Sequence, residues 1–305
     1  MRNLFQYEPP RLLQNFTYAL MLMGYLVWLE SHGTQAWTMV VTELGLVGAF
    51  VGFGFAFYMG WFWLVATPYL LLDRYQKPSW LYRFKIQLRR DGLPTPTDPV
   101  KLRQAMRVVL FNQVFGTLPV LMLVYPLMVW RGMGVDQPVP GSFEVLWQLA
   151  IILLVEEVLF YVVHRTLHIK YLYNRIHRIH HEHKESIAIT THYVHYLEHL
   201  FGNLLPIFAG VFLVGAHPLT ALAWIGLAVT NALHSHSGYN FPWQAWSVHH
   251  DYHHFRVRGN YGVLGLLDWV LKTDGPMRQL HANYMAEQER EHNPLPDGEL
   301  SGTQS

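Results

Sequence analysis

Two stretches of the sequence, HRTLHIKYLYNRIHRIHHEH at residues 164–183 and HHDYHH at residues 249–254, set the expected fold and chemistry of this chain. The segment 164–254 holds 16 of the 19 histidines. They include one H-x-x-x-H pair and two H-x-x-H-H triplets. Because residues three and four positions apart are neighbours on a helix, this spacing predicts that each cluster presents its imidazoles on one helical face.

The clustered histidines are candidate ligands for a metal site. Neutral imidazole is the commonest metal ligand among protein side chains, and eight such rings are enough for two ions. The chain has no cysteine, which excludes disulfides, zinc ribbons, iron–sulfur clusters and thiolate-bound haem. The eight candidate ligands are His164, His168, His177, His180, His181, His250, His253 and His254.

The composition indicates a membrane protein. Hydrophobic residues make up 51% of the chain and charged residues only 14%, against roughly 25% charged residues in ordinary soluble proteins. A net charge of +1, without a basic face interleaved with aromatic residues, gives no indication of nucleic-acid binding. Long apolar runs recur along the chain, and a membrane helix takes about 20 such residues. The runs are residues 12–30, 44–72, 108–130, 143–163 and 200–233.

The last apolar run is broken by the turn sequence GAHP at residues 215–218, so it is expected to form a hairpin. We therefore predict an all-α integral membrane protein. It would have membrane helices at its N-terminus, and because each arm of the last hairpin is short for a full span, we expect that hairpin to be tilted or to penetrate the membrane partly.

The order of the runs also predicts an orientation. Residues 73–105 are polar and rich in lysine and arginine, so the positive-inside rule places them in the cytoplasm. The run 143–163 then delivers His164 to the cytoplasmic side, and the hairpin 200–233 returns the chain there before His250. All three clusters can therefore meet in a histidine-rich helical cap that faces the cytoplasm.

The chain divides into three parts by composition. Residues 1–95 hold the N-terminal membrane helices and most of the basic loop, and residues 96–275 hold every histidine cluster. Residues 276–305 are polar and interrupted by proline and glycine, which predicts a surface extension.

Two acidic residues, Glu156 and Glu157, lie within the apolar sequence LLVEEVLF. Burying a carboxylate in a membrane is costly, so intramembrane acids are candidates for function. Glu157 lies seven residues before His164, on about the same helical face. Its carboxylate is expected to accept a hydrogen bond from the second nitrogen of a ligating imidazole. The alternative is that both acids sit at the membrane surface and extend into water.

From about residue 97 to residue 275, the chain resembles the fatty acid hydroxylase superfamily. That superfamily includes sterol C-4 methyl oxidases, sterol C-5 desaturases, and ceramide and fatty acid hydroxylases. Within it, the chain is most similar to the fatty acid hydroxylase domain-containing proteins, near sterol C-4 methyl oxidase. The similar stretches are TDPVKLRQAMRVVLFNQ, EEVLFYVVHRTLH, YNRIHRIHHEHK, YVHYLEHL, HSGYN, HHDYHH and NYGVLGLLDWVLKTDG.

The resemblance implies four core transmembrane helices in two hairpins, in addition to the N-terminal membrane helices. It also implies a di-iron site on their cytoplasmic side, held by the eight clustered histidines together with His236 of HSGYN. Many relatives have a histidine or aspartate where this chain has Asn240, whose amide oxygen would ligate weakly or hold a water molecule. His195 matches a histidine that recurs in relatives, and Asp268 matches an acid of the family. We expect His195 and Asp268, with Glu157, to support the metal ligands and the catalysis.

The implied reaction is O₂-dependent hydroxylation of a lipid C–H bond, in sterol or other lipid biosynthesis. The resemblance implies two iron ions, for which zinc can substitute, and a substrate tunnel that opens to the lipid. Electrons would come from NAD(P)H through a cytochrome-b type carrier and its reductase. These must be separate proteins, since this chain has no nucleotide-binding glycine motif. The expected location is the endoplasmic reticulum in a eukaryote or the inner membrane in a bacterium.

Two alternatives remain at the level of sequence. A desaturase would use the same site and remove a second hydrogen instead of adding oxygen. A histidine-rich metal transporter is a remote alternative, because transporters carry polar ligands within their membrane spans, whereas these histidines follow the spans.

Overall fold

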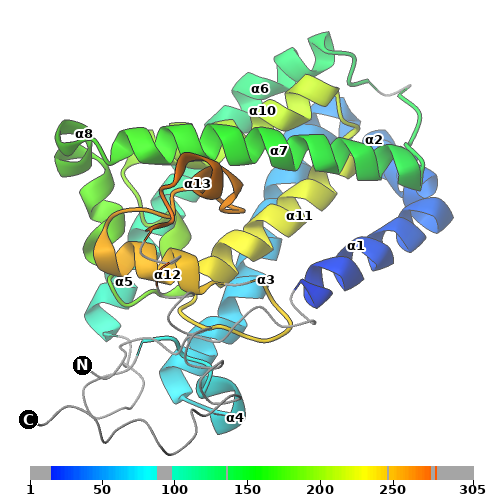
Figure 1. Ribbon diagram of the computed structural model, residues 1–305. Coiled ribbons are helices and arrows are strands. Elements are labelled where there is room, and N and C mark those ends of the chain that lie inside the picture. The colour runs from blue at the N-terminus through cyan, green and yellow to red at the C-terminus, as the bar shows by residue number, and fades with distance from the viewer. Residues whose placement is uncertain (1–14, 88–97, 135–136, 246, 276–278, 280–305) are drawn as a thin grey trace, which may run out of the picture.

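The computed structural model describes residues 15–87, 98–134, 137–245, 247–275 and 279. This part of the chain is helical, and its nearest approach to a strand is an isolated bridge between Lys85 and Tyr239. Figure 1 shows the helices in sequence order. They are α1 (Phe16–Trp28), η1 (Leu29–Gly33), α2 (Thr34–Val47), η2 (Gly48–Phe53), α3 (Gly54–Tyr75), α4 (Ser79–Tyr82), α5 (Pro99–Phe111), η3 (Asn112–Thr117), α6 (Leu118–Trp130), α7 (Ser142–Leu167), α8 (Lys170–Arg175), η4 (His177–Glu182), η5 (Ala188–His192), α9 (Tyr196–Glu198), η6 (His199–Leu204), α10 (Leu205–Val214), α11 (Pro218–Ser235), α12 (Val248–Arg256) and α13 (Leu266–Leu271).

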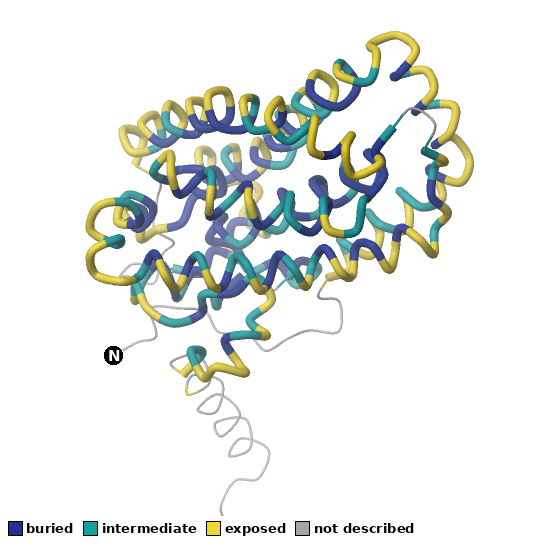
Figure 2. The backbone as a smooth tube through the Cα atoms, turned by 90° about the horizontal axis from the view of Figure 1, so that it is seen from above, coloured by how far each residue is buried: buried dark blue, intermediate teal, exposed yellow. Residues whose placement is uncertain are grey.

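Four helical stretches are long and apolar enough to cross a membrane. They keep large hydrophobic side chains exposed, such as Leu123 and Phe143 at 71% and 83% of full exposure. Figure 2 shows exposed residues along the outer sides of the helices and buried residues between them. The prediction of a helical, multi-pass membrane protein is therefore confirmed. The four stretches are Phe16–Tyr75, Pro99–Trp130, Ser142–Leu167 and Tyr196–Val214.

The two N-terminal apolar runs belong to one helical stretch, Phe16–Tyr75. It bends where Gly45 leaves the helical region, at φ 66° and ψ 170°, a conformation that glycine adopts without a steric penalty. Pro68 lies within α3, and the helix continues past it to Tyr75. This stretch packs against α11, where Trp61 Nε1 donates to the Gly226 carbonyl at 3.0 Å.

The predicted hairpin is present as α10 and α11. The chain turns at Gly215, which has a left-handed conformation with φ 63°. Pro218 opens α11, and the Nδ1 atom of His217 accepts from the Leu219 amide at 3.1 Å. Because α11 starts at this turn and ends at Ser235, it carries the chain back toward the end of α7 that bears the histidines (Figure 1).

Helices α7 and α10 pack with their backbones in close contact. A Cβ atom added at Gly210 would lie 2.8 Å from the Ile152 Cα atom and 3.1 Å from its carbonyl oxygen. Only glycine therefore allows this approach, which holds the hairpin against the helix that bears His164.

A buried ion pair joins α3 to the segment after α4, and a tyrosine of the segment after α11 donates a hydrogen bond to it. Lys85 Nζ lies 2.7 Å from Asp73 Oδ1, and the Tyr239 hydroxyl donates to the same oxygen at 2.7 Å. Buried charges are costly unless they are paired and hydrogen-bonded, as they are here. This pair fixes Tyr239, and with it the short turn that follows His236.

Replacing Gly210 by alanine should destabilise the protein by about 1–3 kcal/mol, the usual cost of overfilling a packed interface. Gly60→Ala is the matched control, because a Cβ there meets nothing within 4 Å and alanine favours the helix. Thermal unfolding in detergent measures both. Equal melting temperatures for the two variants would contradict the close packing of α7 and α10.

Candidate metal centre

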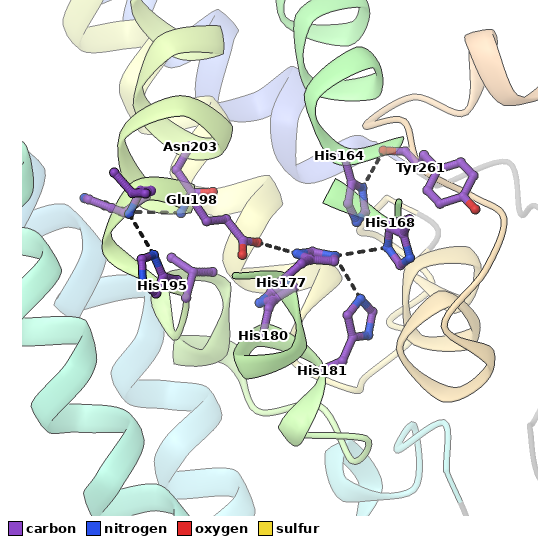
Figure 3. A network of polar contacts seen from close by, with 12 residues as sticks. His164, His168, His177, His180, His181, His195, Glu198, Asn203 and Tyr261 are labelled. Atoms are coloured by element: carbon purple, nitrogen blue, oxygen red, sulfur yellow. Dashed lines mark hydrogen bonds and ion pairs between the residues drawn. The ribbon is translucent and has the colours of Figure 1, made fainter. Parts of the chain in front are cut away.

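Nine histidine side chains converge in two neighbouring groups. Within each group, one ring nitrogen of every member lies within 4.8 Å of the others. Eight of the nine are buried, and His168 is half-buried. Figure 3 shows His164, His168, His177 and His181 facing one another. The first group is His164, His168, His177, His181 and His253, and the second is His180, His236, His250 and His254.

Each H-x-x-H-H triplet supplies both groups. From η4, His177 and His181 enter the first group, while His180 enters the second. From α12, His253 enters the first group, while the other two histidines of this triplet enter the second. The predicted α-helix is present in α12, but η4 winds as a six-residue 3₁₀ helix, a form common in short segments. The triplets thus join the two groups to each other.

The ring nitrogens are spaced as ligands of one ion would be. Two nitrogens at about 2.1 Å from a metal ion and at right angles to each other lie about 3 Å apart. The Nε2 atom of His177 lies 3.0 Å from that of His168 and 3.0 Å from that of His181. In the second group, His236 Nε2 lies 3.3 Å from His180 Nε2 and 2.8 Å from His250 Nε2.

Two further nitrogens point into the first group, and neither has a hydrogen-bond partner among the residues that the structure describes. They are the buried Nε2 atoms of His164 and His253. A buried, unpaired nitrogen carries a desolvation cost that a bound cation removes. The residues present therefore fit a metal ion in each group.

Burial favours the neutral form of three of these imidazoles. It lowers the pKa of His236 to about 4 and that of His181 to about 2. Burial, and then the neighbouring His236 ring, holds the pKa of His180 well below its usual value. The cause is the cost of placing a charge away from water, close to other rings that would also be charged. Neutral imidazoles can bind a metal without first losing a proton.

Hydrogen bonds at the opposite ring nitrogen orient several ligands. Such a bond fixes the tautomer, so that Nε2 has a lone pair for a metal. Three of the four acceptors are backbone carbonyls. The pairs are His164 Nδ1 to the Tyr261 carbonyl at 2.8 Å, His253 Nδ1 to the Gly259 carbonyl at 2.6 Å, His236 Nδ1 to the Ala232 carbonyl at 2.8 Å, and His177 Nδ1 to Glu198 Oε1 at 2.7 Å.

The sequence led us to expect that Glu157 accepts a hydrogen bond from an imidazole, but in the described part of the chain its partners are backbone amides instead. Its carboxylate accepts from the amides of Val263, Leu264 and Leu267 at 2.9, 2.8 and 3.0 Å. The backbone amides of the loop satisfy this buried carboxylate, so Glu157 acts on the ligands through the loop that follows Tyr261.

Asp268 holds the other side of the same loop. It accepts from the amides of Tyr261 and Gly262 at 2.9 and 2.6 Å, and from the Thr273 hydroxyl at 2.6 Å. Because the Tyr261 carbonyl in turn accepts from His164, Asp268 fixes the peptide that orients this ligand. We call residues 259–268 the buttress loop.

His195 and Asn240, the two remaining predicted site residues, have the following contacts in the structure. The Nδ1 atom of His195 accepts from the Leu197 amide at 3.2 Å, which caps the short helix α9. Asn240 is half-buried, and its backbone amide donates to the Phe84 carbonyl at 3.0 Å. The structure thus does not bring His195 into either histidine group.

Glu198 and the carbonyls of the buttress loop were not predicted from the sequence. Glu198 is buried and contacts His177 directly (Figure 3). A signal for Glu198 was present, since it is an acid between two histidines in the otherwise apolar sequence YVHYLEHL. The carbonyls of Gly259 and Tyr261 have no such signal, because every residue has one.

A cavity of about 1050 Å³ borders the histidine groups. Its lining includes histidines of both groups and many apolar side chains. The binding sites of small molecules have this character, with mostly apolar walls and a few polar groups. The histidines are His164, His177, His180, His236 and His250, and the apolar residues include Leu153, Phe160, Trp224, Leu227 and Ala228.

Comparison with known proteins places the site in a family. Residues 149–273, which contain all nine histidines, match the family model for fatty acid hydroxylase. Methylsterol monooxygenase 2-2 of Arabidopsis thaliana is 30% identical over 269 residues, which cover 83% of this chain and 96% of that protein. The chain belongs to the fatty acid hydroxylase family.

Other members of the family are also similar to this chain. Fatty acid hydroxylase domain-containing protein 2 of Homo sapiens is 38% identical over 221 residues, covering 72% of this chain and 66% of that protein. The matched region thus spans just under two thirds of that relative. Very-long-chain aldehyde decarbonylase GL1-11 of Oryza sativa subsp. indica is 32% identical over 256 residues, covering 78% and 92% of the two chains. No solved structure matches.

The buttress loop should control metal affinity. A Cβ atom at Gly262 would lie 2.8 Å from Glu157 Oε1 and 3.1 Å from Asp268 Oδ2. Gly262→Ala should therefore displace both carboxylates and weaken metal binding by about 10–100-fold, as changes behind metal ligands do. Competition with a graded series of chelators measures this affinity.

Gly275→Ala is the matched control, because a Cβ there meets nothing within 4 Å. Its metal affinity should equal that of the unchanged protein. If Gly262→Ala retained metal equally well, the buttress loop would not orient the ligands.

Proposed function

We propose that this protein is a di-iron, O₂-dependent membrane oxidase that hydroxylates a C–H bond of a lipid. The observation that carries the proposal is the pairing of two imidazole groups with an apolar cavity that borders both. Metal ions held there would lie beside whatever fills the cavity. Membership of the fatty acid hydroxylase family supports the choice of a lipid as substrate.

Iron suits the donor set. Imidazole binds iron, zinc, copper and nickel, and the lack of thiolate ligands in this chain removes a donor that favours zinc and copper(I). Nitrogen sites generally bind zinc more tightly than ferrous iron, so zinc can occupy the site as a substitute. The first group would hold one ion and the second group the other.

Bound iron would supply the oxygen chemistry, in which O₂, two electrons and two protons give one hydroxyl group on the lipid and one water molecule. The protein would supply position and exclusion of water. The apolar wall formed by Leu153, Phe160 and Leu227 orients a hydrocarbon chain along the cavity. The buttress loop and Glu198 keep Nε2 of His164 and His177 directed at the metal.

The electrons must come from outside this chain. We propose NAD(P)H as their source, through a cytochrome-b type carrier and its reductase. Basic side chains at the end of α3 and in the segment after it, including Arg74, Lys77 and Arg83, are exposed and suit an acidic carrier or the membrane surface. By the positive-inside rule, this face and the metal centre are cytoplasmic, in the endoplasmic reticulum or a bacterial inner membrane.

A desaturase with the same site is the second candidate, because the ligand set fits both reactions. The names of the relatives also differ, since they include a monooxygenase and an aldehyde decarbonylase. The mass of the product decides, because hydroxylation adds one oxygen atom and desaturation removes two hydrogen atoms. A transporter is disfavoured, because most of the ligands follow the candidate spans.

The test compares the lipids of a strain that lacks the protein with those of strains that express variants. His180→Ala removes one ligand of the second group, so it should abolish the oxidised lipid, as the null strain does. His217→Asn is the matched control, a buried histidine in the hairpin turn where asparagine can also cap α11.

Mass spectrometry of total lipids should show the same lipid accumulating in the null and His180→Ala strains, and normal lipids in the His217→Asn strain. Full production of the oxidised lipid by His180→Ala would contradict the proposal.

A further inference from the structure

One face of α7 lines the cavity. The lining residues Leu153, Glu156, Phe160, His164 and Leu167 follow each other at intervals of three or four, the spacing of a single helical face. Three of them are apolar and suit contact with a lipid chain, and His164 belongs to the metal centre. Glu156 is the exception, an acid in the middle of an apolar wall.

Glu156 is buried, with 8% of its surface exposed, and its carboxylate has no hydrogen-bond partner in the described part of the chain. The other acids that line the cavity do interact: Glu198 with His177 and Asp268 with the buttress loop. Asp274 also has a partner. An unpaired carboxylate within an apolar cavity is costly, and a polar group of a ligand would remove that cost.

Glu156 lies away from the metal centre. It precedes His164 by eight residues, which is about 12 Å along a helix. Helix α11 also ends at the metal centre, just before His236. At the matching distance before His236, eight or nine residues back, the residues of α11 that line the cavity are Leu227 and Ala228. At this distance from the metal centre, α7 therefore presents a carboxyl group to the cavity, whereas α11 presents apolar side chains.

Resting on the proposed function, we propose that Glu156 determines substrate specificity by binding the hydroxyl group of a lipid alcohol, whose oxidised carbon lies at the metal centre. A hydroxyl both donates and accepts, so it pairs with a carboxylate and with a carboxylic acid. An alkane leaves Glu156 unpaired, and a fatty acid anion places a second acid beside it. The substrate would then be oxidised about 12 Å from its hydroxyl, a distance given by the helical rise.

Equilibrium binding tests this role without turnover. The full-length protein with its metal, in detergent micelles and without reductant, is titrated with radiolabelled cetyl alcohol or cholesterol. These arms distinguish a linear alcohol from a sterol. Hexadecane and palmitate are the comparison ligands. Glu156→Leu should weaken binding of the preferred alcohol about tenfold, the loss of one hydrogen bond to a charged or buried group.

Glu156→Gln should stay within about threefold of the unchanged protein, because an amide also donates and accepts. Glu144→Gln, an exposed glutamate at the start of the same helix, is the matched control and should bind normally. Hexadecane should bind Glu156→Leu at least as well as it binds the unchanged protein. A thermal melt of each variant confirms that it is folded.

Equal affinity of Glu156→Leu and the unchanged protein for both alcohols would overturn the inference, as would tighter binding of palmitate than of either alcohol. The proposed function fails separately. An alcohol could bind through Glu156 while the iron-loaded protein with electron donors gives no oxidised product. That result would support the role of Glu156 in binding and contradict the proposed oxidase activity.

Discussion

The structure depends on the convergence of imidazoles whose nitrogens lie about as far apart as ligands of one ion, as in the 3.0 Å between the Nε2 atoms of His168 and His177. Two such nitrogens cannot both keep a lone pair turned toward the other without repulsion. A proton shared between them relieves one pair, but a cation relieves a whole group. The membrane helices, the hairpin and the buttress loop all bring these rings to one place.

The elements around the two groups have separate tasks. Helix α7 contributes His164 at one end and the apolar cavity wall along its length. The hairpin of α10 and α11 returns the chain so that His236 meets α12. The buttress loop connects Glu157 and Asp268 to the rings through backbone groups. Loss of packing far from the metal can therefore alter ligand direction without removing any ligand.

The histidine ligands were predicted from the sequence, whereas most of the groups that orient them through hydrogen bonds were not. Spacing alone identified His177, His180 and His181, because helical neighbours share a face, and composition identified the membrane helices. Their division between two groups depends on how η4 and α12 pack against each other, which local spacing does not contain. Glu157 was predicted to contact an imidazole, but it binds backbone amides instead. No residue type marks the carbonyl of Tyr261 in advance.

The most direct measurement is the number and coupling of iron ions in the purified full-length protein, reconstituted with ferrous iron under exclusion of air. Metal analysis gives the iron content per chain, and Mössbauer spectroscopy after exposure to oxygen reports whether the ions interact. Two histidine groups that share the triplets of η4 and α12 predict two ions per chain with magnetic coupling between them. One isolated ion per chain, or two that do not interact, would contradict a shared di-iron centre.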